Sequence, residues 1–154
     1  MNLFRFCADM LHLLAIVFLL YRIKKERNCV GKQKLSFHLT VIGISCKTQE
    51  IYLVVFLVRY LDLFFYFISL YNTVMKLFFI GSTAGIIYLM RFKKPFCSTY
   101  DAIGDSFKHF MYLLPAAFVL TILCHAGDTT WEWAWSWTLW LEAIAFVPQI
   151  VMLN

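Results

Sequence analysis

The chain has 154 residues, of which 62% are hydrophobic and 15% are charged, and its formal net charge is +5 at pH 7. A soluble domain averages about 45–50% apolar residues. The composition therefore excludes an ordinary soluble domain and predicts one all-α membrane domain over residues 1–154, a polytopic helix bundle. Eleven of the fourteen Lys and Arg residues lie in segments 22–50 and 91–109. This clustering indicates membrane topology rather than a nucleic-acid surface, so no nucleic-acid partner is expected.

Five apolar stretches are long enough to cross a hydrocarbon core of about 30 Å as helices. They cover residues 3–21, 51–71, 75–92, 107–124 and 131–153. The positive-inside rule places the two basic segments in the cytosol and the N-terminus in the lumen or at the exterior. Between the first two helices, residues 32–43 read KQKLSFHLTVIG, whose apolar part is too short to span a bilayer.

Three of the predicted helices carry charged residues on a single face, with both signs of charge in the first and second and carboxylates alone in the fifth. The spacing is i, i+4, i+7 in the first, i, i+3 in the second and i, i+3, i+10 in the fifth. These residues are Arg5, Asp9 and His12, then Arg59 and Asp62, then Glu132, Trp135 and Glu142. Because a charge at the bilayer centre costs about 2.5–3.5 kcal/mol, the three faces are expected to point inward. Guanidinium groups bind carboxylates and carboxylates bind amines, so we predict a pocket for a ligand with both charges, such as a peptide with a free C-terminus.

The same residues have plainer interpretations that the sequence leaves open. Histidine titrates near about pH 6.5, within the range of secretory compartments, which makes His12 a candidate pH sensor as well as a candidate core residue. The structural alternatives for the other residues are an internal Arg59–Asp62 ion pair, an Asp9 that only balances Arg5, and a solvated Glu132.

The chain contains no sequence motif of an enzyme or a metal site. Its five cysteines form no C-x-x-C pair and are interpreted as free thiols. G-x-S-x-G, H-E-x-x-H and P-loop patterns are absent from the sequence. We therefore expect no catalytic residue, no cofactor and no metal ion. GSTAG, residues 81–85, is interpreted as a helix-packing motif.

Four blocks of the sequence resemble a known family. They are MNLFRFCADMLHLLAIVFLLYRI, RYLDLF, ISLYNTVMK and WLEAIAFVPQI. Over residues 1–31 and 44–154 the chain resembles the ER lumen protein-retaining receptor, or KDEL/HDEL receptor, family. The resemblance implies a seven-helix, multi-pass membrane protein of the ER and Golgi, with a PQ-loop or SWEET-like fold in which Pro148 and Gln149 form the PQ pair.

The resemblance also implies a function. The family binds the C-terminal Lys-Asp-Glu-Leu or His-Asp-Glu-Leu signal of luminal ER proteins in the acidic Golgi, releases it at the near-neutral pH of the ER, and travels in coated vesicles. The implied partners are this tetrapeptide, membrane lipid and coat proteins. By the match of motifs, Arg59 and Tyr60 receive the terminal carboxylate of the signal, and Arg5 pairs with its glutamate.

The remaining site residues are also assigned through the resemblance. Asp62, Glu132 and Trp135 are expected at the lysine or histidine end of the signal. His12 and Glu142 are expected in the network that senses protons.

The chain departs from the family pattern at three places. Residues 32–43 are interpreted as an insertion in the first cytosolic loop, and Phe65 and Tyr66 replace a usual Thr-Asn pair. The family has two more helices after the PQ helix, which help to complete the pocket, so we expect binding by this chain to be impaired by truncation. The alternatives are a small PQ-loop-type transporter and a non-binding splice remnant.

Overall fold

The computed structural model describes residues 3–30, 44–65, 67, 69–94, 96–100 and 103–153, except for the side chains of residues 4, 5, 26–30, 64, 98, 99 and 153. The predicted insertion at 32–43 lies outside these ranges. Every regular element within them is helical, as predicted. The elements are α1 (Leu3–Val30), α2 (Cys46–Arg59), the 3-10 helix η1 (Leu61–Phe64), α3 (Leu70–Arg91), α4 (Phe96–Thr99), α5 (His109–Leu123), α6 (Thr130–Ile144) and α7 (Val147–Leu153).

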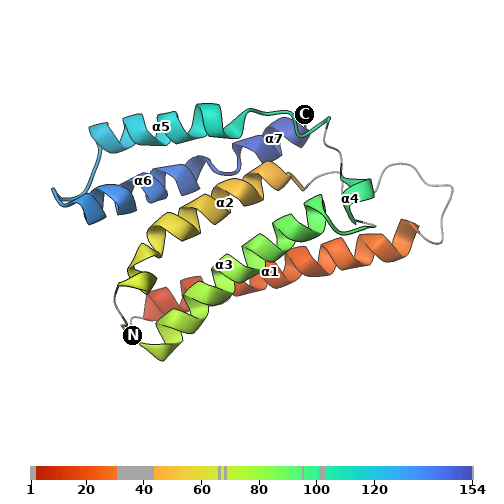
Figure 1. Ribbon diagram of the computed structural model, residues 1–154, viewed down its shortest axis with the longest axis horizontal. Coiled ribbons are helices and arrows are strands. Elements are labelled where there is room, and N and C mark those ends of the chain that lie inside the picture. Colours follow the sequence, from red (N-terminus) through yellow and green to blue (C-terminus); the bar gives the residue numbers. More distant parts are fainter. Residues whose placement is uncertain are drawn as a thin grey trace.

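The long helices run in alternating directions along the long axis of the molecule, with α2 at the centre (Figure 1). Helices α3 and α6 flank α2, α1 lies against α3, and α5 lies against α6. One end of the bundle holds the start of α1, η1 and the connection from α5 to α6. The opposite end holds α4, α7 and the start of α2. The described basic residues of the two basic segments therefore lie at one end, as the topology prediction requires.

Two of the five predicted spans are single helices long and apolar enough to cross a membrane in the described chain. These are Phe6–Lys25 and Leu70–Arg91. The predicted helix over 51–71 is wrong in its bounds: α2 begins at Cys46, because the Ser45 side chain accepts from Thr48 N–H at 3.2 Å, and it ends at Arg59. The chain then turns through η1 before α3 begins.

The predicted helix over 131–153 is divided into α6 and α7, just before Pro148. Proline has no backbone N–H and cannot continue a helical ladder, whereas the first turn of a helix needs no such donor. Pro148 occupies the second position of α7 and its side chain is fully buried. The break therefore lets the chain keep a buried proline without losing a hydrogen bond.

Helix α2 contributes to both apolar cores. On one side its residues meet α1, α3 and α4 in a cluster of Ile16, Ile23, Ile44, Cys46, Phe56, Phe79, Ile86, Met90 and Phe96. On the other side they meet α5 and α6 in a cluster of Ile51, Val55, Leu113, Ala117, Leu141 and Ala145. In a bilayer such contacts stabilise by close packing rather than by exclusion of water, and small residues allow the helices to approach. Ala117 of α5 and Ala145, which follows α6, are fully buried small residues of the second cluster.

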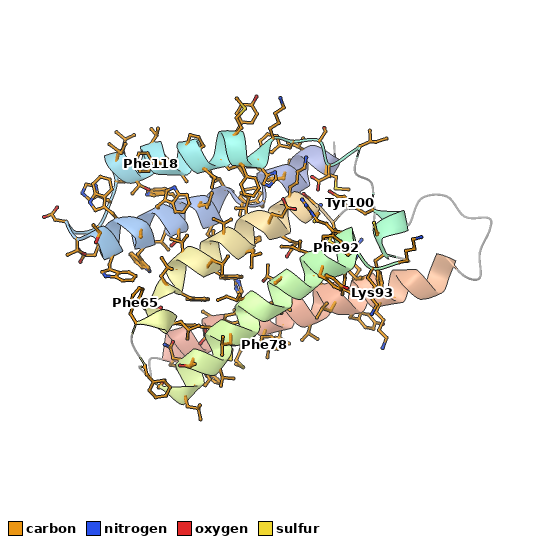
Figure 2. All side chains as sticks on the ribbon, viewed as in Figure 1. Phe65, Phe78, Phe92, Lys93, Tyr100 and Phe118 are labelled. Atoms are coloured by element: carbon orange, nitrogen blue, oxygen red, sulfur yellow. The ribbon has the colours of Figure 1, made fainter. Side chains whose placement is uncertain are left out.

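The outer surface is strongly apolar, as expected for helices that face lipid. Figure 2 shows Phe118 on α5 and Phe78 on α3, and both side chains are exposed. The interpretation of GSTAG as a tight packing motif is wrong for the described residues. A Cβ atom added at Gly81 or Gly85 would meet nothing within 4 Å.

Candidate functional site

Arg59 connects the C-terminal end of α2 to α6. Its Nη1 lies 2.5 Å from Glu142 Oε2, and its Nε–H donates to Thr138 Oγ1 at 3.2 Å. The Thr138 hydroxyl in turn donates to the Trp135 carbonyl at 2.7 Å, which leaves its lone pairs to accept from Arg59. The third nitrogen, Nη2, is buried and has no hydrogen-bond partner in the described part of the chain. Arg59 is therefore held firmly and still carries one unused donor.

Asp62 lies in η1, one turn beyond Arg59, and pairs with a cation from α3. Lys76 Nζ is 2.5 Å from Asp62 Oδ2, and it also lies 5.4 Å from the centroid of the Tyr60 ring. Lys76 is only 5% exposed, so its charge needs this partner. Asp62 Oδ1 is buried and accepts no hydrogen bond from the described residues.

Arg59 and Asp62 do not form the internal pair that the sequence left open as an alternative. Each has a different partner, Glu142 and Lys76 respectively. Arg59 and Asp62, about one helical turn apart, thus present one nitrogen with unused N–H donors and one unused carboxylate oxygen. Buried polar atoms without partners are rare and costly in native proteins. This arrangement can accept a ligand that brings an anionic and a cationic group to the same end of the bundle.

His12 lies on a different side of α2 from Glu142. Its ring meets Phe56 and Phe79 edge-on, with centroids 5.5 Å and 5.4 Å away. It lines a cavity of about 180 Å³ together with Tyr52 and Gln49. Glu142 instead faces Arg59 from α6. The contacts of the two predicted proton-sensing residues in the described chain are therefore separate, and their shared role in proton sensing stays a prediction.

Glu132 and Trp135 lie on the first two turns of α6. Glu132 is exposed and forms a capping box, in which Thr129 N–H and O–H donate to Glu132 Oε2 at 3.0 Å and 2.7 Å. Trp135 is 49% exposed and lines a groove of about 430 Å³ with Cys124 and His125. Within the described residues these two side chains contact α6 and its connection to α5, so their role at the amine end of a ligand stays a prediction.

The predicted roles at the N-terminus are only partly visible. The side chain of Arg5 lies outside the described residues. Asp9 accepts a hydrogen bond from the Tyr71 hydroxyl at 3.2 Å, which ties α1 to the start of α3. The proposed pairing of Asp9 with Arg5 stays a prediction.

A buried polar cluster at the opposite end of the bundle was missed by the sequence analysis. Asp105, which is 2% exposed, accepts from the Ser45 hydroxyl at 2.9 Å, from Lys47 N–H at 3.2 Å and from the Tyr100 hydroxyl at 2.6 Å. Burial and the hydrogen bond to Asp105 raise the pKa of the Tyr100 phenol, so it remains a donor. Gln149 of the PQ pair joins the same region, since its Oε1 accepts from Ser45 N–H at 2.8 Å. The cluster anchors α2 and α7 to the loop before α5.

A second carboxylate beside this cluster binds two further helices. Glu50 on α2 pairs with Arg91 at the end of α3, and its Oε2 lies 2.9 Å from His109 Nε2 at the start of α5. Glu50 and His109 are the last residues of the two basic segments 22–50 and 91–109, where their spacing in the sequence carries no signal. Only the fold brings them together.

Comparison with known proteins identifies the family. The sequence pattern of the family described as "ER lumen protein retaining receptor" matches residues 40–154. The chain belongs to this receptor family. It is 45% identical over its 154 residues to the ER lumen protein-retaining receptor of Plasmodium falciparum, and 42% identical to ER lumen protein-retaining receptor B of Arabidopsis thaliana. It covers 64% and 66% of those two relatives, so it spans about two thirds of the length of the curated relatives it matches.

The family assignment confirms the resemblance drawn from the motifs. The names of these relatives describe receptors that retain proteins of the ER lumen, and none of them names an enzyme. All of the predicted site residues discussed above except Arg5, Asp9 and His12 fall within the matched segment 40–154. A receptor of this family that consists of apolar helices is a membrane protein of the ER and Golgi.

Proposed function

We propose that the chain binds the C-terminal retention signal of luminal ER proteins, a peptide ending in Lys-Asp-Glu-Leu or His-Asp-Glu-Leu, and returns its bearers from Golgi to ER. The observation that carries this proposal is the pair of unused buried atoms, Arg59 Nη2 and Asp62 Oδ1. The terminal carboxylate of the signal accepts from the first, and its lysine or histidine approaches the second.

The chemistry of Arg59 supports a carboxylate ligand. A guanidinium group presents its N–H donors in a planar fork, so one edge can hold Glu142 while the remaining nitrogen binds a second anion. Tyr60 follows directly in sequence, at the end of α2, and its ring stacks on Phe56 with centroids 5.7 Å apart. The Tyr60 ring is thus held by packing, at the position that directly follows Arg59 in the chain.

We further propose a multi-pass arrangement with the N-terminus and this site on the luminal side. The described basic residues of segments 22–50 and 91–109, from Arg22 to Lys108, gather at the end of the bundle opposite the site, which the positive-inside rule places in the cytosol. Coat proteins of the retrieval vesicles would be met at that cytosolic end.

The presence of Glu142 beside Arg59 is expected to make ligand binding stronger at acidic pH. When a ligand carboxylate binds Arg59, two carboxylates share one guanidinium, and their repulsion favours the uptake of a proton by the site. Binding that takes up a proton is strengthened as the pH falls and weakened as it rises. The sign agrees with capture in an acidic compartment and release at near-neutral pH.

We expect a peptide ending in Lys-Asp-Glu-Leu to bind the chain in membranes at least about tenfold more tightly near pH 5.5 than near pH 7.2, because about one proton is taken up with it. Saturation binding of a fluorescent peptide at the two pH values measures this difference. The matched variant is Glu142→Gln, which removes the shared carboxylate and is expected to reduce the pH dependence.

Two results would contradict the proposal. One is the absence of peptide binding at either pH. The other is binding that is equally tight at both values in the wild type, which would remove the link between proton uptake and capture.

A further inference from the structure

Lys76 is a buried cation at the candidate site to which neither the motifs nor the comparisons assign a role. It lies in the second turn of α3, is 5% exposed, and reaches Asp62 Oδ2 at 2.5 Å. Its ammonium group also lies over the face of Tyr60, 5.4 Å from the ring centroid. Buried ammonium groups require a counter-charge, and Asp62 supplies it here.

The carboxylate that neutralises Lys76 is the one to which the lysine of the signal is assigned. Asp62 has two oxygens: Lys76 occupies Oδ2, and Oδ1 is buried without a hydrogen-bond partner among the described residues. A cationic ligand group that binds Oδ1 comes within roughly 5 Å of the Lys76 ammonium, where two like charges repel appreciably in a partly buried site. A neutral ligand group meets no such repulsion.

We propose that Lys76 is a specificity-determining residue, which acts as the resident counter-ion of Asp62 and competes with a cationic first residue of the signal. This inference rests on the proposed function. Lys76 moderates the preference of the site for a cation over a neutral residue at that position, and it keeps Asp62 compensated when no ligand is bound.

The test compares two peptides that differ only in the first residue of the signal, Lys-Asp-Glu-Leu and Ala-Asp-Glu-Leu, at one acidic pH. Their ratio of dissociation constants is measured in the wild type, in Lys76→Met and in Lys76→Arg. Removing the competing charge is expected to raise the preference for lysine by about tenfold. Lys76→Arg keeps the charge and is expected to retain the ratio of the wild type.

The ratio of the two dissociation constants distinguishes competition between Lys76 and the ligand lysine from a purely structural role of Lys76. Both peptides carry the same carboxylate end, so any disturbance of Tyr60 affects them equally and cancels. Lys93→Met, which alters an exposed lysine at the opposite end, serves as the control. If Lys76→Met yields too little folded protein, Lys76→Gln makes the same prediction while keeping a donor to Asp62.

If the ratio in Lys76→Met lies within about twofold of the wild-type ratio, this inference is overturned. The proposed function would still stand, because it depends on binding of the signal and not on the preference for its first residue. A wild type that binds neither peptide would overturn the proposed function, and the inference with it.

Discussion

Replacement of Arg59 by alanine is expected to lower affinity for the retention signal by roughly 30- to 150-fold, which corresponds to the loss of about 2–3 kcal/mol from a hydrogen bond between charged groups. The same change leaves Glu142 on α6 without its cation and removes the donor to Thr138, so the contact between α2 and α6 weakens too. Saturation binding in membranes measures the dissociation constant. The maximal number of binding sites per amount of protein measures how much of the variant is folded.

Arg59→Lys distinguishes the two effects. Lysine keeps a positive charge for Glu142, but its single ammonium cannot serve Glu142, Thr138 and a ligand together. We therefore expect Arg59→Lys to retain most of the folded sites and to lose most of the affinity. Unchanged affinity in Arg59→Lys would show that the planar fork is not used for the signal.

Replacement of Asp105 by alanine is expected to destabilise the chain by about 3 kcal/mol, because it leaves one buried and two partly buried donors without an acceptor. The donors are the Ser45 hydroxyl, Lys47 N–H and the Tyr100 hydroxyl. For a chain of this size such a loss lowers the unfolding temperature by roughly 6–12 °C. Thermal unfolding in detergent or nanodiscs measures the change.

Asp128→Ala is the matched control for Asp105→Ala. Asp128 is an exposed aspartate in the connection between α5 and α6. Its replacement is expected to change stability by less than about 0.5 kcal/mol. If the two variants unfold at the same temperature, the buried cluster around Asp105 contributes nothing to stability and our account of that end of the bundle fails.

The helical class was predictable from the composition, and the family was predictable from four sequence blocks. The bounds of the second and fifth predicted helices were not. Hydropathy continues without a break through Tyr60 and Phe65, yet the chain turns there, since Arg59 and Asp62 reach partners on α6 and α3 respectively. Hydropathy likewise gives no sign that the chain leaves the helical conformation between α6 and α7, just before Pro148.

The site was predicted in part. Helical spacing showed that Arg59 and Asp62 share a face, but spacing within one helix cannot identify partners on others. Lys76 received no role from the sequence, although it is the counter-charge of Asp62. Thr138, a small polar residue among tryptophans, gave no signal at all, and it accepts from Arg59. Contacts between helices, which decide these roles, are properties of the fold.

The central claim is that Arg59 receives the free carboxylate of a retention signal. The most direct measurement compares two peptides ending in Lys-Asp-Glu-Leu, one with a free C-terminus and one amidated, for binding to the wild-type chain in membranes at acidic pH. Our account predicts at least about 100-fold tighter binding of the free acid, because the amide lacks the charge that the buried guanidinium requires. Equal binding of the two peptides would contradict it.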